Sequence, residues 1–108
     1  KRKEAFSRAD SLLAGLSLLD RKDHRPGTLS GGERQRVAIG RALALSPDII
    51  FADEPTGSLD EKTALAVESL LLDAVRASGS ALVYVTHNSE FALRADRALI
   101  LTEGVLVG

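Results

Sequence analysis

Two neighbouring carboxylates, Asp53 and Glu54, follow directly after the apolar run 49–52. Short continuous apolar runs are typical of strands buried on both faces of a parallel sheet. We therefore expect both carboxylates at the carboxyl edge of a sheet, where α/β proteins bind ligands. Carboxylates at such an edge can bind a cation such as Mg²⁺, directly or through water, as Asp53 could, or orient or deprotonate an attacking water, as Glu54 could. Taken alone, the two residues fit a strand that ends in a solvated acidic turn equally well.

A histidine occupies the corresponding place after a second apolar run, 81–85. Because the carboxyl ends of parallel strands meet at one edge of a sheet, His87 is expected beside Asp53 and Glu54. An imidazole there can hydrogen-bond a phosphate group and respond to its loss. A single histidine at a strand end is more often only a polar cap. His24, in a polar loop without such neighbours, is interpreted as nothing more than a polar loop residue.

The octapeptide 29–36, Leu-Ser-Gly-Gly-Glu-Arg-Gln-Arg, combines a helix start with two glycines. Ser30 and Glu33 have the spacing of a capping box, and Gly31 and Gly32 have no side chains to block the backbone. Free N–H groups at the positive end of a helix dipole favour anions. For Ser-Gly-Gly alone, an ordinary capped helix is the more frequent explanation. The segment 55–60 can likewise be only a turn that leads into a helix capped by Asp60.

The elements that would position these residues follow from hydrophobic periodicity and capping signals. We expect a helix over 4–19, a polar loop over 20–27, and a helix from Ser30 that Pro47 stops. The apolar side of this second helix is expected to contain Val37, Ile39, Ala42, Leu43 and Leu45. One further helix is expected from Asp60 to about Ser78, with Gly79 as its cap, and another over 89–95. Strands are expected over 49–52, 81–85 and 98–101, and the segment 105–107 is expected to pair antiparallel with the last of them. Strands that alternate with helices predict an α/β fold with a parallel sheet.

Composition narrows the class of protein. A length of 108 residues allows one small domain, and the net charge of −1 gives no general attraction to nucleic acid or to an anionic membrane. The absence of cysteine excludes disulfides and thiolate metal sites. No apolar run approaches the roughly 20 residues that cross a bilayer.

Taken together, the four segments resemble the signature, Walker-B, D-loop and H-loop motifs of ATP-binding-cassette (ABC) transporter ATPases, in that family's order, over about 26–108. The segments 52–60 and 95–104 look most like the lipoprotein-releasing, macrolide-export and cell-division-type group. The resemblance implies a partial P-loop NTPase-like α/β fold, in which helices flank a mostly parallel sheet and the N-terminal part is the end of a helical subdomain. It divides one ATPase domain into a helical and signature part, about 1–45, and a Walker-B to H-loop part, 46–108.

The resemblance also implies a role for each motif residue in Mg²⁺-dependent ATP hydrolysis. Glu54 and His87 would be catalytic, and Asp53 would bind the metal. Residues that would contact ATP across a dimer are Ser30, Gly31, Gly32 and Asp60. The implied partners are a second nucleotide-binding subunit and a transmembrane permease, with no nucleic acid. The implied location is cytoplasmic, at the inner face of the cell membrane.

The sequence departs from the family in one important respect. It contains no Gly-x-x-x-x-Gly-Lys-Ser/Thr loop to hold the nucleotide phosphates. The family's adenine-stacking aromatic and Q-loop glutamine are also missing, since Gln35 belongs to the signature. With no initiator methionine, we expect the C-terminal portion of a longer ATPase, inactive by itself. Unpaired strand edges and exposed apolar surface would follow.

Two other functions remain open from the sequence. One is the C-terminal lobe of a chromosome-maintenance or DNA-repair ATPase, which predicts an upstream coiled coil and a basic face. The only basic clusters are 1–3 and the arginines Arg34, Arg36 and Arg41, which a solvated helix face also explains. The amino-acid sequence of residues 54–60, and the short spacing from it to His87, favour the transporter type. The other is a naturally truncated regulatory protein that pairs with a full-length subunit.

Overall fold

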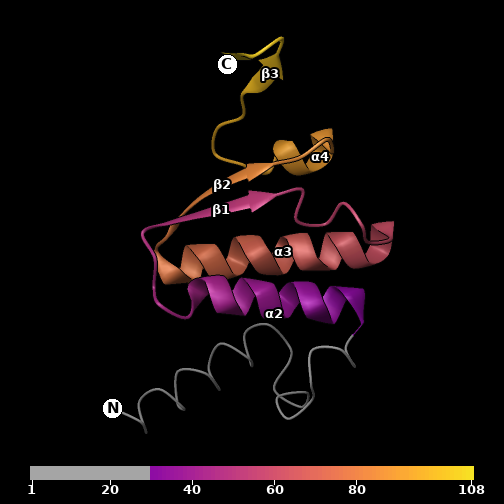
Figure 1. The fold of residues 1–108 in the computed structure, drawn as a ribbon, viewed down its shortest axis with the longest axis vertical. Coiled ribbons are helices and arrows are strands. Elements are labelled where there is room, and N and C mark those ends of the chain that lie inside the picture. The colour runs from indigo at the N-terminus through magenta and orange to yellow at the C-terminus, as the bar shows by residue number, and fades with distance from the viewer. Residues whose placement is uncertain (1–29) are drawn as a thin grey trace, which may run out of the picture.

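The computed structural model describes residues 30–108. In chain order its elements are α2 (Gly31–Leu43), β1 (Ile49–Asp53), α3 (Glu61–Ser78), β2 (Ala81–Val85), α4 (Ser89–Ala92), β3 (Ile100–Thr102) and β4 (Val105–Val107). Figure 1 shows α2 and α3 side by side below the β1–β2 pair, with the β3–β4 hairpin extending away from them. The helix predicted over 4–19 and the loop over 20–27 lie outside the described residues.

The two central strands are parallel, as the sequence predicts. Strands β1 and β2 pair in register from Ile49 opposite Ala81 to Asp53 opposite Val85, and α3 connects them. Their carboxyl ends therefore meet at one edge. The predicted antiparallel hairpin is confirmed as β3 paired with β4, but it forms a second sheet that is separate from β1–β2. Glu103 and Gly104 between them both have positive φ, which a two-residue type I′ turn requires.

Capping residues set the ends of the helices where the sequence predicts them. Ser30 caps α2 with both halves of a capping box, through the backbone and side chain of Glu33. Asp60 accepts a hydrogen bond from the Thr63 amide at the start of α3, and Gly79 closes that helix in the left-handed conformation, at φ 74°. Helix α4 is shorter than the predicted 89–95 and ends at Ala92.

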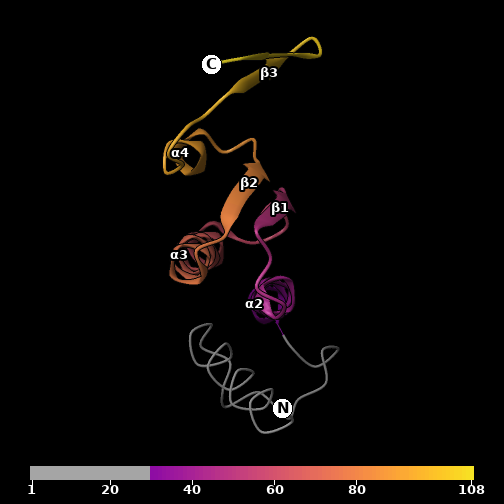
Figure 2. The same cartoon turned by 90° about the vertical axis from the view of Figure 1, so that its left-hand side faces the viewer.

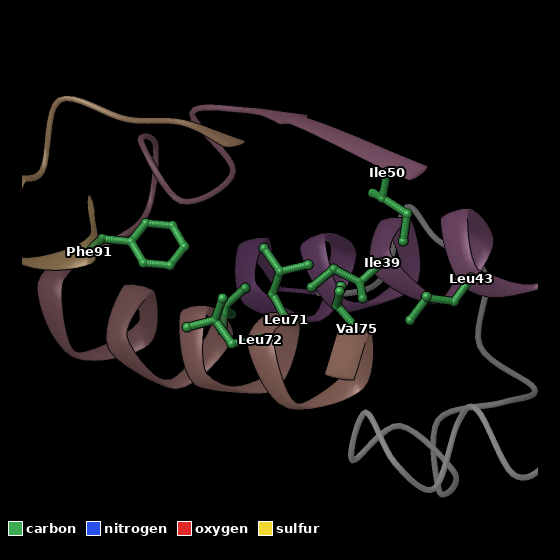
Figure 3. Packing of buried hydrophobic residues seen from close by; sticks show 8 residues of the cluster. Ile39, Leu43, Ile50, Leu71, Leu72, Val75 and Phe91 are labelled. Carbon is green, nitrogen blue, oxygen red and sulfur yellow. The ribbon is translucent and has the colours of Figure 1, made fainter. Parts of the chain in front are cut away.

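A single apolar cluster joins the helices to β1. Figure 3 shows side chains from α2, α3, β1 and α4 converging between the two long helices and the strand. The buried apolar residues are Ile39, Leu43, Ile50, Val67, Leu71, Leu72, Val75 and Phe91. Leu82 and Tyr84 of β2 pack against the cluster and are half-buried. The predicted apolar side of α2 is therefore confirmed at Ile39, Leu43 and half-buried Val37, whereas Ala42 and Leu45 are exposed.

Strands β1 and β2 are covered on one face only, so the expectation that they are buried on both faces is wrong. Ile49 and Phe51 are 54% and 77% exposed, and across the pair Val83 and Val85 are more than half exposed as well. In Figure 2 the helices lie below and to the left of the two strands, and no described segment covers the other side. Alternate residues face opposite sides of a strand, so Ile50 reaches the helices while its neighbours face outward.

The hairpin adds further exposed apolar surface. Every residue of β3 and β4 is exposed, among them Ile100, Leu101 and Leu106. Exposed apolar surface and open strand edges were both expected from the sequence. Within residues 30–108, no helix is long and apolar enough to cross a membrane.

We predict that this open face makes the chain self-associate. Replacing Phe51 with Thr keeps a residue that favours strands but removes most of its exposed apolar area, so the dissociation constant of the associated species should rise. Sedimentation velocity over a concentration series measures the change. Leu45→Thr is the matched control, because Leu45 is 92% exposed but lies outside the sheet. Equal effects of the two substitutions, or a wild-type chain that stays monomeric throughout, would contradict the prediction.

Candidate functional site

Glu54 and His87 meet beyond the carboxyl ends of β1 and β2. The Oε1 atom of Glu54 lies 3.1 Å from Nε2 of His87, within ion-pair distance when the imidazole is protonated. The His87 side chain is 95% exposed, whereas that of Glu54 is 33% exposed. The Oε1 atom itself is buried and accepts no well-aligned hydrogen bond from the described residues. The predicted proximity of these two residues is confirmed, and the carboxylate oxygen retains capacity to accept a proton or a hydrogen bond.

The backbone at Glu54 is held in an unfavourable conformation. Its φ is 46°, in the left-handed region that residues with a side chain rarely adopt. Such a conformation costs about 1–3 kcal/mol and persists only where the surroundings impose it. The Glu54 amide donates to the carbonyl of Val85 at 2.8 Å, and the Gly57 amide donates to the Glu54 carbonyl at 3.1 Å. The end of β2 and the following turn thus fix the direction of the Glu54 side chain.

Asp53 is the last residue of β1 and is exposed. It pairs in register with Val85, two residues before His87. The two adjacent carboxylates therefore have different surroundings: that of Asp53 is open to solvent, while that of Glu54 is partly enclosed by the turn and the imidazole. An exposed carboxylate at a sheet edge suits cation binding, and a partly buried one suits proton transfer.

The segment that carries His87 is fixed on both sides. Asn88 caps α4 by accepting hydrogen bonds from the amides of Glu90 and Phe91, and its own amide donates to the hydroxyl of Thr86 at 3.0 Å. From β2, the Tyr84 hydroxyl donates to the Phe91 carbonyl at 2.7 Å, and the two rings stack with centroids 4.3 Å apart. Burial raises the pKa of Tyr84, so its hydroxyl stays protonated and remains a donor.

The three signature residues have different surroundings. Ser30 is exposed, and its hydroxyl already accepts a hydrogen bond from the Glu33 amide as a helix cap. Gly32 is buried against α3, where an added Cβ would lie 2.7 Å from Cγ2 of Thr63. A Cβ on Gly31 would lie 3.2 Å from Cδ2 of Leu59, in the turn before α3. The glycines thus allow α2 to pack closely on α3 and its preceding turn.

All of the predicted site residues lie at one end of the fold. In Figure 1 the starts of α2 and α3 and the carboxyl ends of β1 and β2 point to the same side. Asp60 is exposed there as the cap of α3, and the hydrogen bonds from Thr63 lower its pKa below the ordinary value. The structure therefore brings Glu54 into contact with His87 and places Ser30, Gly31 and Asp60 at the same end.

Sequence reasoning missed the residues that support this site. Tyr84 was interpreted only as part of an apolar strand, and Thr56 only as part of a turn. The Thr56 hydroxyl donates to Oε2 of Glu68 at 2.8 Å, and Glu68 is 1% exposed. One signal in the sequence was available: Glu68 follows Val67 and precedes Leu71 by three positions, so it falls within the apolar face of α3.

Comparison with known proteins identifies the family. A family model described as ABC transporter matches residues 1–57, which is more than half of the chain. The chain belongs to the ABC transporter family. The resemblance drawn from the four motifs is thereby confirmed, as is the α/β fold of an ABC ATPase cassette.

Individual relatives of this ABC chain agree with the subgroup expected from segment 52–60. The lipoprotein-releasing system ATP-binding protein LolD 1 of Rhodospirillum rubrum is 56% identical over 106 residues, covering 98% of this chain and 47% of the relative. The chain is 42% identical to the bacterial ABC transporter cassette MJ0796, solved as a dimer, with a TM-score of 0.77 over 96% of this chain and 45% of that one. It is 28% identical to cbiO1 of Clostridium perfringens, part of the ABC transporter complex cbiONQ, with a TM-score of 0.90 over 99% and 43%. The chain thus spans about half the length of the relatives that it matches.

The close approach of Thr63 to Gly32 leads to a testable prediction about the packing of α2 on α3. Gly32→Ala should lower the free energy of unfolding by about 1 kcal/mol, because overpacking costs about 1–3 kcal/mol and alanine recovers up to about 1 kcal/mol of helix propensity. Thr63→Ser removes the obstructing Cγ2, so in that background Gly32→Ala should become neutral or stabilising. Urea denaturation of the four proteins measures the coupling. Additive effects of the two substitutions would show that Gly32 does not pack on Thr63.

The cap at Asp60 predicts a dependence of stability on pH. Because hydrogen bonds from Thr63 lower the pKa of Asp60 from 3.8, its ionised form stabilises the fold above pH 3.8, and this contribution is lost as the pH falls through the lowered value. Asp60→Ala should lower the thermal midpoint at pH 7, whereas Asp60→Asn keeps a capping oxygen and should lower it less. The difference in midpoint between wild type and Asp60→Asn should shrink below pH 3.8. A difference that is constant from pH 7 to pH 2.5 would contradict this assignment.

Proposed function

We propose that this chain supplies the signature, Walker-B, D-loop and H-loop segments of an ATP-hydrolysing subunit of an ABC transporter of the lipoprotein-releasing type. The observation that carries the proposal is the contact of Glu54 with His87 at the carboxyl ends of two parallel strands. The identity of 56% to a lipoprotein-releasing ATP-binding protein supports the subgroup. The comparisons do not favour the chromosome-maintenance alternative, since the relatives described above are transporter ATPases.

The acidic residues at this edge fit a magnesium ion only together with a nucleotide. No group of three or more histidines, cysteines or carboxylates that could hold a metal occurs in residues 30–108. Mg²⁺ is commonly bound by one or two carboxylates, with substrate phosphates and water as further ligands. Asp53, exposed at the strand end, would be the protein ligand. When bound with ATP, the ion would neutralise charge on the phosphate oxygens.

Glu54 has the position and surroundings of a group that accepts a proton from water. Its buried Oε1 has spare hydrogen-bonding capacity, and its backbone is fixed by Val85 and Gly57. A carboxylate so placed can orient the attacking water and take its proton as the water oxygen bonds to the γ-phosphorus and the bond from that phosphorus to the leaving ADP oxygen breaks. His87 lies on the solvent side of this oxygen. Its contact with Oε1 would hold the Glu54 carboxylate in place before nucleotide binds, and the single hydrogen on Nε2 would then be donated to the phosphate.

The remaining motif residues would act on a second site in a dimer. Exposed Ser30 and half-buried Gly31 form the start of α2, where N–H groups and the helix dipole attract phosphate oxygens. In this proposal they face the nucleotide of a second nucleotide-binding subunit, and Asp60 lies near the contact between the subunits. The backbone of Gly32 would face the same nucleotide, and its missing side chain lets α2 pack closely on α3. The proposed domain division, a helical and signature part over about 1–45 and a Walker-B to H-loop part over 46–108, follows the same scheme.

The proposal includes a membrane partner and a location. ABC ATPase subunits act on transmembrane permeases, and the segment before Gly27 is proposed to contact one. The subunit would then be cytoplasmic and attached to the inner face of the membrane through that permease. The phosphate-binding loop that this sequence lacks would come from the part of the full ATPase that precedes the matched region.

The first test is Mg-ATP binding by calorimetry, with the chain alone and with a chimera that joins the N-terminal part of the Rhodospirillum rubrum relative to Lys1. We expect the chimera to bind Mg-ATP and the chain alone not to bind it, because only the chimera contains the phosphate-binding loop. Tight binding by the chain alone would overturn the assignment of these motifs, and no binding by a folded chimera would overturn the proposed function.

The same chimera tests the role of Glu54. Glu54→Gln should lower the steady-state ATPase rate about 10²–10⁴-fold, the usual contribution of a general base, while calorimetric binding of Mg-ATP persists. Glu61→Gln is the matched control, since Glu61 is an exposed glutamate in the first turn of α3. An ATPase rate that survives Glu54→Gln would remove Glu54 from the reaction.

A further inference from the structure

Glu68 is a buried carboxylate that the proposed function does not use. It lies in the second turn of α3 beside core residues Val67 and Leu71, and its side chain is 1% exposed. Burial of an ionised group is unfavourable unless hydrogen bonds compensate for the lost water. An apolar residue would continue the pattern of this helix face. A carboxylate at this position therefore needs a partner that donates a hydrogen bond to it.

That partner is Thr56, in the turn that follows the catalytic candidate. The Thr56 hydroxyl donates to Oε2 of Glu68 at 2.8 Å, across twelve positions of the chain. Two backbone hydrogen bonds shape the turn itself, from Gly57 to Glu54 and from Leu59 to Thr56. Both close the turn locally. The Thr56–Glu68 bond differs because it attaches the turn to the side of α3, which belongs to the packed core.

The attachment matters because Glu54 is strained. A residue with φ 46° tends to relax to an ordinary conformation unless its neighbours prevent it. Glu54 is held to β2 on one side through Val85. On the other side, the next polar side chain in the turn is Thr56, and its hydroxyl is held by Glu68. Both ends of the strained residue are thus fixed to different parts of the core.

We propose that Glu68 is a positioning residue, whose carboxylate holds Thr56 and thereby keeps the Glu54 carboxylate in place against His87. This inference rests on the proposed role of Glu54 in ATP hydrolysis. Glu68 acts through Thr56 and is too deeply buried to contact a nucleotide. Its loss should therefore affect the rate of the chemical step and leave the binding of ATP unchanged.

Two substitutions in the chimera separate positioning from stability. Glu68→Leu fills the same apolar site without an acceptor, so the thermal midpoint should be retained or rise. Its kcat should nevertheless fall at least about tenfold, since small displacements of a catalytic group have effects of this size or larger, while KM for ATP stays the same. Glu68→Gln keeps an oxygen that accepts from Thr56 and should recover most of kcat. A role in stability alone predicts instead that Glu68→Leu retains full kcat.

Thr56 supplies the matching half of a double-mutant cycle. Thr56→Val removes the donor with little change in shape, and Thr56→Ser keeps it. In the Glu68→Leu background, Thr56→Val should lower kcat no further, because the bond is already lost. Fully additive losses in kcat would show that the two residues act independently and would overturn the proposal.

Amide hydrogen exchange in the 108-residue chain gives a readout that needs no activity. The amides of Gly57 and Leu59 should exchange faster in Glu68→Leu than in wild type or Glu68→Gln, while core amides of α3 stay as protected as before. If the wild-type chimera shows no ATPase activity, the proposed function fails, and the exchange rates still decide whether Glu68 holds the turn. Unchanged exchange of Gly57 and Leu59 in Glu68→Leu would overturn the inference.

Discussion

The packing of α3 against α2, β1, β2 and α4 is the constraint on which the rest of the structure depends. Four of the eight buried apolar residues belong to this helix, while α2 contributes two and β1 and α4 contribute one each. Burying each such side chain stabilises the fold by roughly 1.5–3 kcal/mol. Because α2, β1, β2 and α4 each contribute at most two buried side chains to the core, the position of each is set by how it meets α3. Displacing α3 would move the starts of α2 and α4 and the end of β1 together.

The site depends on this packing more than on its own contacts. His87 is 95% exposed, and an exposed ion pair contributes at most about 1 kcal/mol, so its contact with Glu54 cannot hold the two strands in register. The parallel crossover through α3 does so instead, since it brings both carboxyl ends to one edge. The strain at Glu54, about 1–3 kcal/mol, is likewise offset by the core around it. The catalytic candidates are therefore placed by residues that take no part in the proposed chemistry.

Much of this arrangement could be predicted from the sequence because local signals determine it. Ser30, Asp60 and Gly79 define the helix ends through hydrogen bonds with residues only a few positions away. The apolar runs before Asp53 and Thr86 define two strands, and the parallel crossover then places His87 next to Glu54. The prediction of α4 over 89–95 is too long, because the amides of Arg94 and Ala95 bond to carbonyls three residues back and the chain continues as turns and bends.

The features that could not be predicted depend on residues distant in sequence. An apolar run shows that Phe51 is able to be buried, but not that a second layer is present, and here none of the described residues covers it. The approach of Gly32 to Thr63 and the bond from Thr56 to Glu68 each join two segments whose distance is fixed only after α2, the turn and α3 have packed. A glutamate within the apolar face of a helix indicates that it has a hydrogen-bonding partner, but the sequence does not show which residue that partner is.

These distant contacts also link the start of α2 to the turn that carries Glu54. Gly31 approaches Leu59 and Gly32 approaches Thr63, so the first residues of α2 touch both the turn and the first part of α3. Thr56 lies three positions before Leu59 in the same turn and is held from the other side by Glu68. If a group that binds at the start of α2 displaced this helix, the displacement would reach the turn through packed side chains and not through solvent. Such contact carries coupling only if the turn has two distinct arrangements, and the bonds from Glu54 to Val85, from Gly57 to Glu54 and from Thr56 to Glu68 instead favour a single one.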